Sequence, residues 1–314
     1  MSARQVAEAI GAGLEDVGAR VDLLPAADGG EGTMEILLDA LGGERRSAEV
    51  HDPLGRPIEA EFALIRGGRE AIVEVAAASG LGLVDPAERD PERASSAGTG
   101  ELIVAAIDAR ARRVLVAAGG SATTDGGRGA IEALEAAGGI GDASLEVLSD
   151  TTVPFERAAE VFAPQKGASP EQVARLGSRL VALAGSLPRD PRGRAMSGAA
   201  GGLSGGLWAA FDAHLIPGAA TVLGLLGFDR RLEDAGAVIT GEGRLDLQSS
   251  QGKLTGEVAR RCRAAGIPAH AIVGELALER SELKRLGFTS AEEARTPDAI
   301  REAAGRIGVS SGRG

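Results

Sequence analysis

Three apolar runs in this chain lead directly into clusters of glycine, and this pattern constrains the fold more than any other feature. The runs are residues 19–24 (ARVDLL), 113–118 (RVLVAA) and 237–239 (AVI). Helical patterns follow the first two clusters, over residues 34–41 and 128–137. A strand that passes through a glycine loop into a helix is typical of α/β proteins, and such loops lie at the carboxyl ends of strands, where ligands bind. The sequence therefore predicts an α/β fold with its ligand site at these loops.

The stretch from residue 45 to residue 78 has a different sequence pattern. Its apolar segments are separated by DPLG at 52–55 and RGGR at 66–69, which are typical of turns between neighbouring antiparallel strands. A further buried strand is expected at 269–273, followed by a helix at about 277–286. This arrangement predicts two α/β domains, one of which carries hairpins.

Three helix starts are marked by their capping residues. Ser2 and Gln5 form a capping box, which predicts that the chain opens with a helix over residues 3–17. Ser169 and Gln172 form a second capping box, with proline at the first helical position. Thr296-Pro297 opens the last predicted helix in a similar way.

The composition excludes several classes of protein. The 314 residues are 44% hydrophobic and 25% charged, which fits a globular chain. The net charge of −11 and the 2% aromatic content argue against partners such as nucleic acid or anionic membranes. Cys262 is the sole cysteine, so internal disulfides are excluded, and the start has no signal-peptide pattern. We expect a cytoplasmic protein that binds small molecules.

Glycine loops offer an acidic protein a means of holding phosphate or carboxylate. Their backbone N–H groups and the following helix N-terminus attract anions, although a single loop is more often only a tight turn. Three loops that each contain a carboxylate or hydroxyl favour a function. Neither standard nucleotide fingerprint is present: residues 251–254 (QGKL) lack the hydroxyl of a P-loop, and Gly241-x-Gly243 lacks the third glycine of a dinucleotide loop.

The segment 240–248 (TGEGRLDLQ) carries the strongest chemical signal. It places two carboxylates, an arginine and an amide after a buried strand, with Lys253 close behind. Phosphoryl transfer needs carboxylates for magnesium and cations for the transferred oxygens. A solvated charged loop is the alternative interpretation. Lys166 also lies beside glycine, in a chain with only three lysines, whereas the three histidines share no metal-binding spacing.

With these loops in place, the chain resembles the bacterial glycerate kinase family of the type without a P-loop. The matching motifs, in family order, are AADGGEGT at 26–33, DPLG at 52–55, EVAAASGL at 74–81, GTGELI at 98–103, GGSATTDGG at 119–127, FAPQKGA at 162–168, GAAGGL at 198–203 and ITGEGRLDLQS at 239–249. The resemblance implies a Rossmann/flavodoxin-like parallel-sheet domain from residues 1–48 and 215–314. It also implies an inserted mixed-sheet α/β domain at 49–214, with the active site in the cleft between the two domains.

The resemblance further implies that ATP and Mg²⁺ serve to phosphorylate D-glycerate, to 2-phosphoglycerate rather than 3-phosphoglycerate. Asp125, or else Asp150, is expected to accept the hydroxyl proton, with Lys166 and Arg244 as further catalytic residues. Glu242 and Asp246 are the expected magnesium ligands. The expected substrate- and nucleotide-binding residues are Asp28, Gly29, Gly30, Glu31, Gly119, Gly120, Ser121, Thr123, Gly241, Gly243, Gln248 and Lys253. A homo-oligomer is compatible with this assignment.

Two departures from the family pattern leave alternatives open. Family members normally begin with a strand and a Pro-Asp-Ser-Phe-Lys-Gly loop, of which only the following Ser2-Ala3 is matched here. The region from Gly141 to Phe162 is also short, although Asp150 is kept. One alternative is therefore a catalytically silent relative that binds nucleotide or glycerate, and another is a kinase for a different small hydroxy acid.

Overall fold

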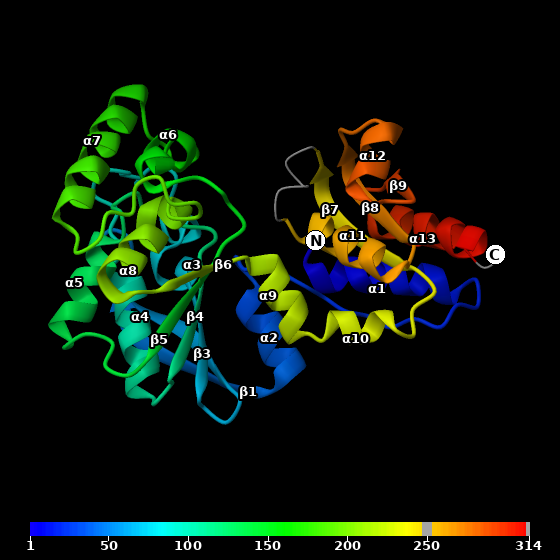
Figure 1. Ribbon diagram of the computed structural model, residues 1–314, viewed down its shortest axis with the longest axis horizontal. Coiled ribbons are helices and arrows are strands. Elements are labelled where there is room, and N and C mark those ends of the chain that lie inside the picture. Colours follow the sequence, from blue (N-terminus) through cyan, green and yellow to red (C-terminus); the bar gives the residue numbers. More distant parts are fainter. Residues whose placement is uncertain (247–252, 312–314) are drawn as a thin grey trace. The chain divides into compact units, whose positions relative to one another are not determined.

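The computed structural model describes residues 1–246 and 253–311 and divides into two compact units (Figure 1). We call residues 29–221 the central unit, and residues 1–28 together with those from 222 onward the terminal unit. Each unit has its own sheet, which confirms the α/β class expected from the strand–glycine–helix pattern. Among the helices of the described residues, none combines the length and apolar character that a membrane span requires.

The central unit contains a six-stranded sheet whose strands follow one another in sequence order. The strands are β1 (Gly43–His51), β2 (Pro57–Ile65), β3 (Glu70–Glu74), β4 (Arg113–Ala117), β5 (Ser144–Leu148) and β6 (His214–Ile216). The first three pair antiparallel, which confirms the predicted hairpins, and β3 to β6 pair parallel. The parallel strands therefore all end at one edge of the sheet.

Helices precede, connect and follow these strands. The α-helices are α2 (Thr33–Leu41), α3 (Val75–Ser79), α4 (Ala97–Asp108), α5 (Arg128–Ala136), α6 (Ala158–Phe162), α7 (Pro170–Ser186), α8 (Leu203–Phe211) and α9 (Gly218–Leu225), the last of which crosses into the terminal unit. Four 3₁₀ turns accompany them: η1 (Leu81–Leu83), η2 (Phe155–Arg157), η3 (Pro164–Lys166) and η4 (Ala199–Gly202). The predicted capping box of α7 is confirmed, since Ser169 Oγ accepts from Gln172 N and Gln172 Oε1 accepts from Ser169 N.

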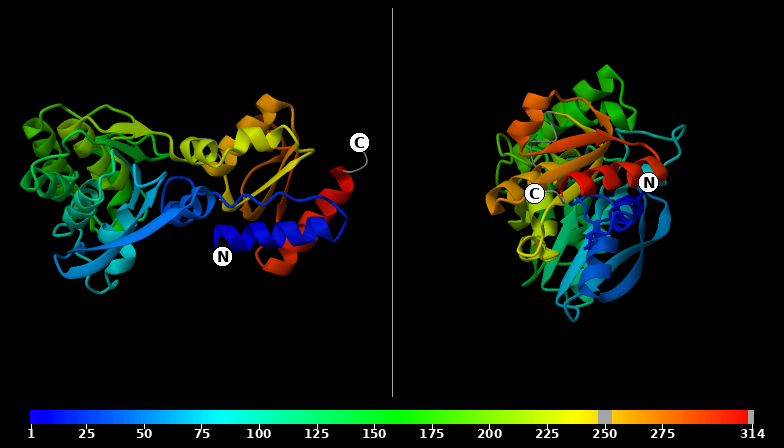
Figure 2. Two further views of the ribbon diagram at one scale, coloured as in Figure 1. Left: turned by 90° about the horizontal axis from the view of Figure 1, so that it is seen from below. Right: turned by 90° about the vertical axis from the view of Figure 1, so that its right-hand side faces the viewer.

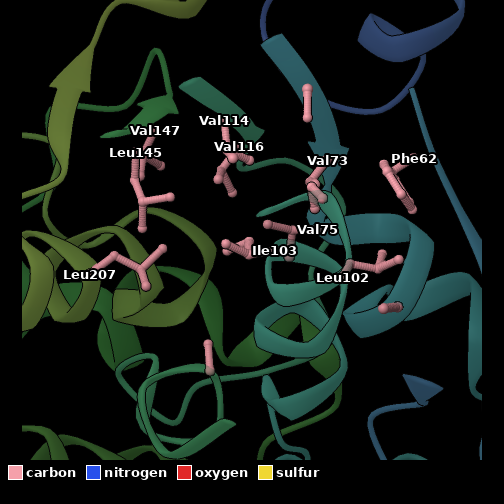
Figure 3. Close-up of a cluster of buried hydrophobic side chains, with 14 of the residues drawn as sticks. Phe62, Val73, Val75, Leu102, Ile103, Val114, Val116, Leu145, Val147 and Leu207 are labelled. Atoms are coloured by element: carbon pink, nitrogen blue, oxygen red, sulfur yellow. The ribbon is translucent and has the colours of Figure 1, made fainter. Parts of the chain in front are cut away.

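The main core of the central unit lies between the sheet and α4. Val73, Val114, Val116 and Val147 project from three strands toward helical side chains such as Ile103, and all five are fully buried (Figure 3). Burying one such aliphatic side chain stabilises the fold by about 1.5–3 kcal/mol. The helix α2 lies on the other side of the sheet from α4 (Figure 1) and contacts β1, β2 and β3. Because helices pack on both faces, the sheet is held in place together with the carboxyl ends of its parallel strands.

The terminal unit contains a three-stranded parallel sheet in the order β7-β8-β9. Its strands are β7 (Val238–Leu245), β8 (Ala269–Leu276) and β9 (Ser290–Glu293), and its helices are α1 (Ala3–Glu15), α10 (Phe228–Leu232), α11 (Leu254–Ala265), α12 (Arg280–Leu286) and α13 (Pro297–Ser311). Helices α1 and α13 lie side by side (Figure 2), where Arg301 pairs with Asp16 at 2.6 Å. The capping box predicted at Ser2 is confirmed.

Two predicted elements differ from the structure. Residues 19–24 form no strand. Asp22 pairs with Arg231, and Leu24 packs against the hydrophobic core of the terminal unit, so side-chain contacts hold this segment instead of hydrogen bonds to a neighbouring strand. Residues 240–245, expected as a glycine loop, continue strand β7, because β8 offers backbone partners along this length.

The compact units also begin and end at different residues from the expected domains. Residues 29–48 were expected in the terminal domain but contact the central unit instead. The physical reason is that β1 pairs with β2 along all nine residues from Gly43 to His51, and α2 packs on the same sheet. Residues 215–221 lie in the central unit as well, because β6 pairs with β5.

Candidate active site

The carboxyl ends of the parallel strands in the central unit gather several glycine-containing segments. A Cβ atom on Gly119, just after β4, would lie 2.6 Å from Cα of Gly30. A Cβ atom on Gly29 would lie 2.7 Å from Cα of Gly218, which follows β6. Such separations are too short for any side chain, so glycine is needed for these backbones to meet. The predicted residues Gly29, Gly30 and Gly119 are therefore brought together at this edge.

The loop after β4, residues 119–127, is fixed to the segment that follows β3. Gly120 adopts a φ of +67°, which favours glycine. Ala122 N donates to Ser79 O and Leu81 N donates to Gly120 O, both at 2.8 Å. Ser121 also forms an antiparallel bridge with Gly80. These backbone bonds hold the loop against the segment that follows β3.

Lys166 lies buried beneath this loop and is 3% exposed. Its Nζ donates to Ser121 Oγ at 2.9 Å and to the carbonyl oxygen of Thr123 at 2.5 Å. Burial lowers the pKa of Lys166 to about 7, and the charge of Asp125 opposes this shift. The structure therefore brings three of the predicted site residues, Lys166, Ser121 and Thr123, into direct contact around one ammonium group.

Asp125 is engaged by four hydrogen-bond donors. Its Oδ2 accepts from Ser96 N at 2.9 Å, from Ser96 Oγ at 2.7 Å and from Gly129 N at 3.1 Å. Its Oδ1 accepts from Gly127 N at 3.1 Å. This carboxylate thereby caps the start of α5 and ties it to the residue that precedes α4. The geometry favours a positioning role for Asp125 over the role of proton acceptor.

Two further predicted carboxylates lie at the same edge. Asp150, which follows β5, accepts from Ala219 N in the first turn of α9 at 3.0 Å. Glu31 Oε2 lies 3.3 Å from the position of a Cβ atom on Gly120, so this carboxylate borders the loop after β4. Asp150 and Glu31 thus lie at the ends of the parallel strands, as Lys166 does.

Glu74, the last residue of β3, was not among the predicted site residues. Its side chain accepts from Met34 N at 2.7 Å and is 9% exposed. Desolvation raises the pKa of Glu74, and the nearby charges of Glu31 and Glu35 add to this effect. An acid that ends an otherwise apolar buried strand is a signal in the sequence that could have identified it.

A cavity of about 720 Å³ lies between α5 and α7. It is lined by Thr124 and Asp125 from the loop and by apolar side chains of α7 such as Leu176 and Leu183. Its size falls in the range of small-molecule pockets.

The other predicted residues lie in the terminal unit, around the end of β7. Glu242 Oε1 accepts from Thr255 Oγ1, in the first turn of α11, at 2.5 Å. Arg244 pairs with Glu275 at 3.2 Å and with Asp246 at 3.6 Å. Lys253 is the N-cap residue of α11. Gly241 and Gly243 lie within β7, Asp28 ends the first segment of the unit, and Gln248 is outside the described residues.

The acidic side chains near the end of β7 can be compared with the ligands that a magnesium ion requires. Within residues 1–246 and 253–311, no three histidine, cysteine or acidic side chains gather closely enough to hold a metal ion on their own. Magnesium in kinases needs less, since one or two carboxylates together with substrate phosphates complete its coordination. Glu242 and Asp246, two residues of one segment at the end of β7, fit that smaller requirement.

Comparison with known proteins identifies the family. The model of the glycerate kinase family matches residues 1–138 and 136–306. The chain belongs to the glycerate kinase family. It is therefore an enzyme of the phosphotransferase class, and the resemblance noted from its motifs is confirmed.

Named relatives in the glycerate kinase family cover most of the chain. It is 38% identical to a "Glycerate kinase" of Bacillus subtilis, over 92% of this chain and 85% of the relative. It is 36% identical to a "Glycerate 2-kinase" of Escherichia coli, over 88% and 82%. Among solved structures, a putative glycerate kinase 2 from Salmonella typhimurium LT2 matches with a TM-score of 0.82 and 34% identity, covering 99% of this chain and 94% of the other.

Proposed function

We propose that this enzyme transfers the terminal phosphoryl group of ATP to a hydroxyl of D-glycerate, with Mg²⁺, and that 2-phosphoglycerate is the product. The observation that carries the proposal is the buried Lys166 ammonium beneath the loop after β4, in a chain whose relatives are named glycerate kinases. The product is proposed from the name of the Escherichia coli relative, a glycerate 2-kinase.

Lys166 and the loop after β4 are suited to holding an oxyanion. A cation in a site shielded from water interacts strongly with phosphate or carboxylate oxygens, and backbone N–H groups of a glycine-rich turn add further donors. A positively charged Lys166 would stabilise the charge on the transferred phosphoryl group, as kinases require. Gly119, Gly120 and Ser121 would contribute the surrounding donors.

Proton acceptance from the glycerate hydroxyl is assigned to Asp150. Asp125, the first choice from the sequence, has both oxygens committed to four donors, so we assign it the role of fixing the loop and α5. Asp150 is the alternative that the sequence offers, and it lies just after β5, where it accepts from Ala219 N. In this scheme the hydroxyl oxygen attacks the phosphorus atom, the hydroxyl proton passes to the carboxylate, and ADP leaves.

The residues of the terminal unit would serve the magnesium ion and the phosphates. Glu242 and Asp246 would hold the ion, which neutralises charge on the phosphate oxygens when bound. Arg244 and Lys253 would bind phosphate or the glycerate carboxylate. If both groups of residues serve one reaction, substitutions in either unit must reduce turnover.

The direct test is a phosphorus NMR assay of the product formed from ATP, Mg²⁺ and each member of a panel of small hydroxy acids. We expect D-glycerate to be the preferred acceptor and the new ester to be on the 2-hydroxyl. Preference for another hydroxy acid would replace glycerate as the substrate, and the absence of any phosphate ester would favour a catalytically silent protein.

A further inference from the structure

Arg89 is a half-buried arginine close to Lys166 in which one shielded nitrogen lacks a partner. It lies in the segment between η1 and α4, and its side chain is half-buried. The Nε atom is shielded from solvent and has no hydrogen-bond partner within the described part of the chain. We propose that Arg89 binds an oxyanion of a substrate, beside Lys166, and that it is a binding residue of the phosphoryl-transfer site.

Comparison with the other arginines shows that this state is unusual. Most arginines of this acidic chain are paired with a carboxylate, a backbone carbonyl or an aromatic ring. In the described residues, those without such a partner other than Arg89 are all exposed: Arg20, Arg69, Arg93, Arg110, Arg230 and Arg280. Exposed guanidinium groups are satisfied by water, whereas a buried N–H without a partner is costly. Arg89 is therefore the arginine whose environment calls for a ligand.

The acids closest to Arg89 in the sequence are already engaged elsewhere. Glu88 pairs with Arg56 at 3.0 Å, and Glu92 pairs with Arg175 at 2.8 Å. Asp90 Oδ1 accepts from the backbone N–H groups of residues 92 and 93. Local carboxylates thus leave Arg89 without a partner, although the chain has 45 acidic residues.

The position of Arg89 links it to Lys166. A Cβ atom built on Gly167 would lie 3.9 Å from the Cβ of Arg89, so the two residues are neighbours in space. Gly167 directly follows Lys166, whose Nζ contacts Ser121 and Thr123. The segment that leads to Arg89 also pairs with this loop, through Leu81 N and Gly120 O. Arg89 therefore lies next to the turn that carries Lys166.

An oxyanion fits this pair of cations better than other ligands do. The guanidinium presents a planar fork of N–H groups that matches two oxygens of a carboxylate or phosphate, and the lysine adds a point charge. Glycerate and ATP both carry such oxygens. The inference rests on the proposed function, because it assigns Arg89 to one of the two substrates of that reaction.

The test compares wild type with Arg89→Ala, Arg89→Lys and the control Arg69→Ala, which removes an exposed arginine in the turn between β2 and β3. Steady-state kinetics give KM separately for glycerate and for ATP. We expect Arg89→Ala to raise KM for one of them roughly 10- to 100-fold, with Arg89→Lys in between and Arg69→Ala unchanged. The substrate whose KM changes identifies the oxyanion.

Stability and binding measurements separate the other outcomes. A structural role predicts a lower melting temperature for Arg89→Ala together with unchanged KM values, and that result would overturn the proposal. Calorimetric titration with D-glycerate and with ATP supplies a readout that does not need turnover. If wild type binds one ligand but transfers no phosphate, only the proposed function fails, and weaker binding by Arg89→Ala still supports the inference. Equal binding by both proteins overturns it, as does a wild type that binds neither ligand.

Discussion

The carboxylate of Glu74 at the end of β3 accepts a 2.7 Å hydrogen bond from the backbone N–H of Met34, in the first turn of α2. These residues are 40 positions apart, and the contact fixes the start of α2 directly after the glycine turn that contains Glu31. No side chain of α2 itself caps this helix start. Glu74, a residue of the sheet, therefore satisfies a backbone N–H group at the start of α2, which is usually the role of an N-cap side chain.

The raised pKa of Glu74 predicts a pH dependence of stability. Because burial raises this pKa in the folded state, the folded protein binds the proton more tightly than the unfolded chain does. The contribution to stability is fully present below the unfolded pKa near 4.5 and is lost as the pH rises through the folded pKa. Glu74→Gln keeps an acceptor for Met34 N but cannot titrate, so it should gain stability relative to wild type over this pH interval.

Urea denaturation from pH 4.5 to pH 8 checks this prediction. Glu49→Gln, a change at an exposed acid of β1, is the matched control and should show no such trend relative to wild type. Parallel stability curves for wild type and Glu74→Gln would mean that Glu74 does not carry the predicted linkage.

Asp125→Ala should destabilise the central unit by about 2–3 kcal/mol, because four hydrogen bonds to one half-buried carboxylate are lost together. The loss should be visible as a lower urea midpoint with an unchanged slope. An Asp125→Ala protein of wild-type stability but without activity would restore the interpretation of Asp125 as the proton acceptor.

Gly119→Ala should impair both stability and turnover. The added Cβ would lie 2.6 Å from Gly30 Cα and 3.1 Å from Glu31 N, so two backbone segments must move apart, at a cost of about 1–3 kcal/mol. Gly185→Ala is the control, since this glycine is in α7 with no atom near its Cβ position, and alanine should stabilise the helix there by about 0.5–1 kcal/mol. Equal thermal shifts for the two variants would contradict the close approach of these loops.

Lys166 predicts a pH dependence of the opposite sign to that of Glu74. Its pKa is about 7 in the folded protein and near 10.5 in the unfolded chain, so the unfolded chain holds more protons between these values. Wild type should therefore gain stability relative to Lys166→Met as the pH rises from 7 to 10. A constant stability difference across this interval would show that Lys166 is not desolvated in solution.

Much of the fold could be predicted from local patterns in the sequence. Capping boxes at Ser2 and Ser169 marked helix starts correctly, because the side-chain contacts that satisfy a helix end are local. The turn sequences at 52–55 and 66–69 marked the hairpins for the same reason. The family motifs then identified the enzyme class.

The errors came from contacts that the local sequence does not encode. Gly241 and Gly243 suggested a loop, but pairing with β8 extends the strand through both of them. The role of Asp125 is now proposed differently, because the fold shows Ser96, 29 residues earlier, donating to it twice. Arg89 drew no notice for the same reason, since its lack of a partner depends on how Glu88 and Glu92 pair elsewhere.

The most direct test of the central claim is the rate of glycerate-dependent ADP release by wild type, Lys166→Met and Lys284→Met. The two variants remove the same charge, from a buried site beneath the loop after β4 and from the exposed surface of α12 respectively. We predict a loss of roughly 10²–10⁴-fold for Lys166→Met and none for Lys284→Met. Wild-type turnover by a folded Lys166→Met protein would contradict the claim that this buried ammonium holds the phosphate.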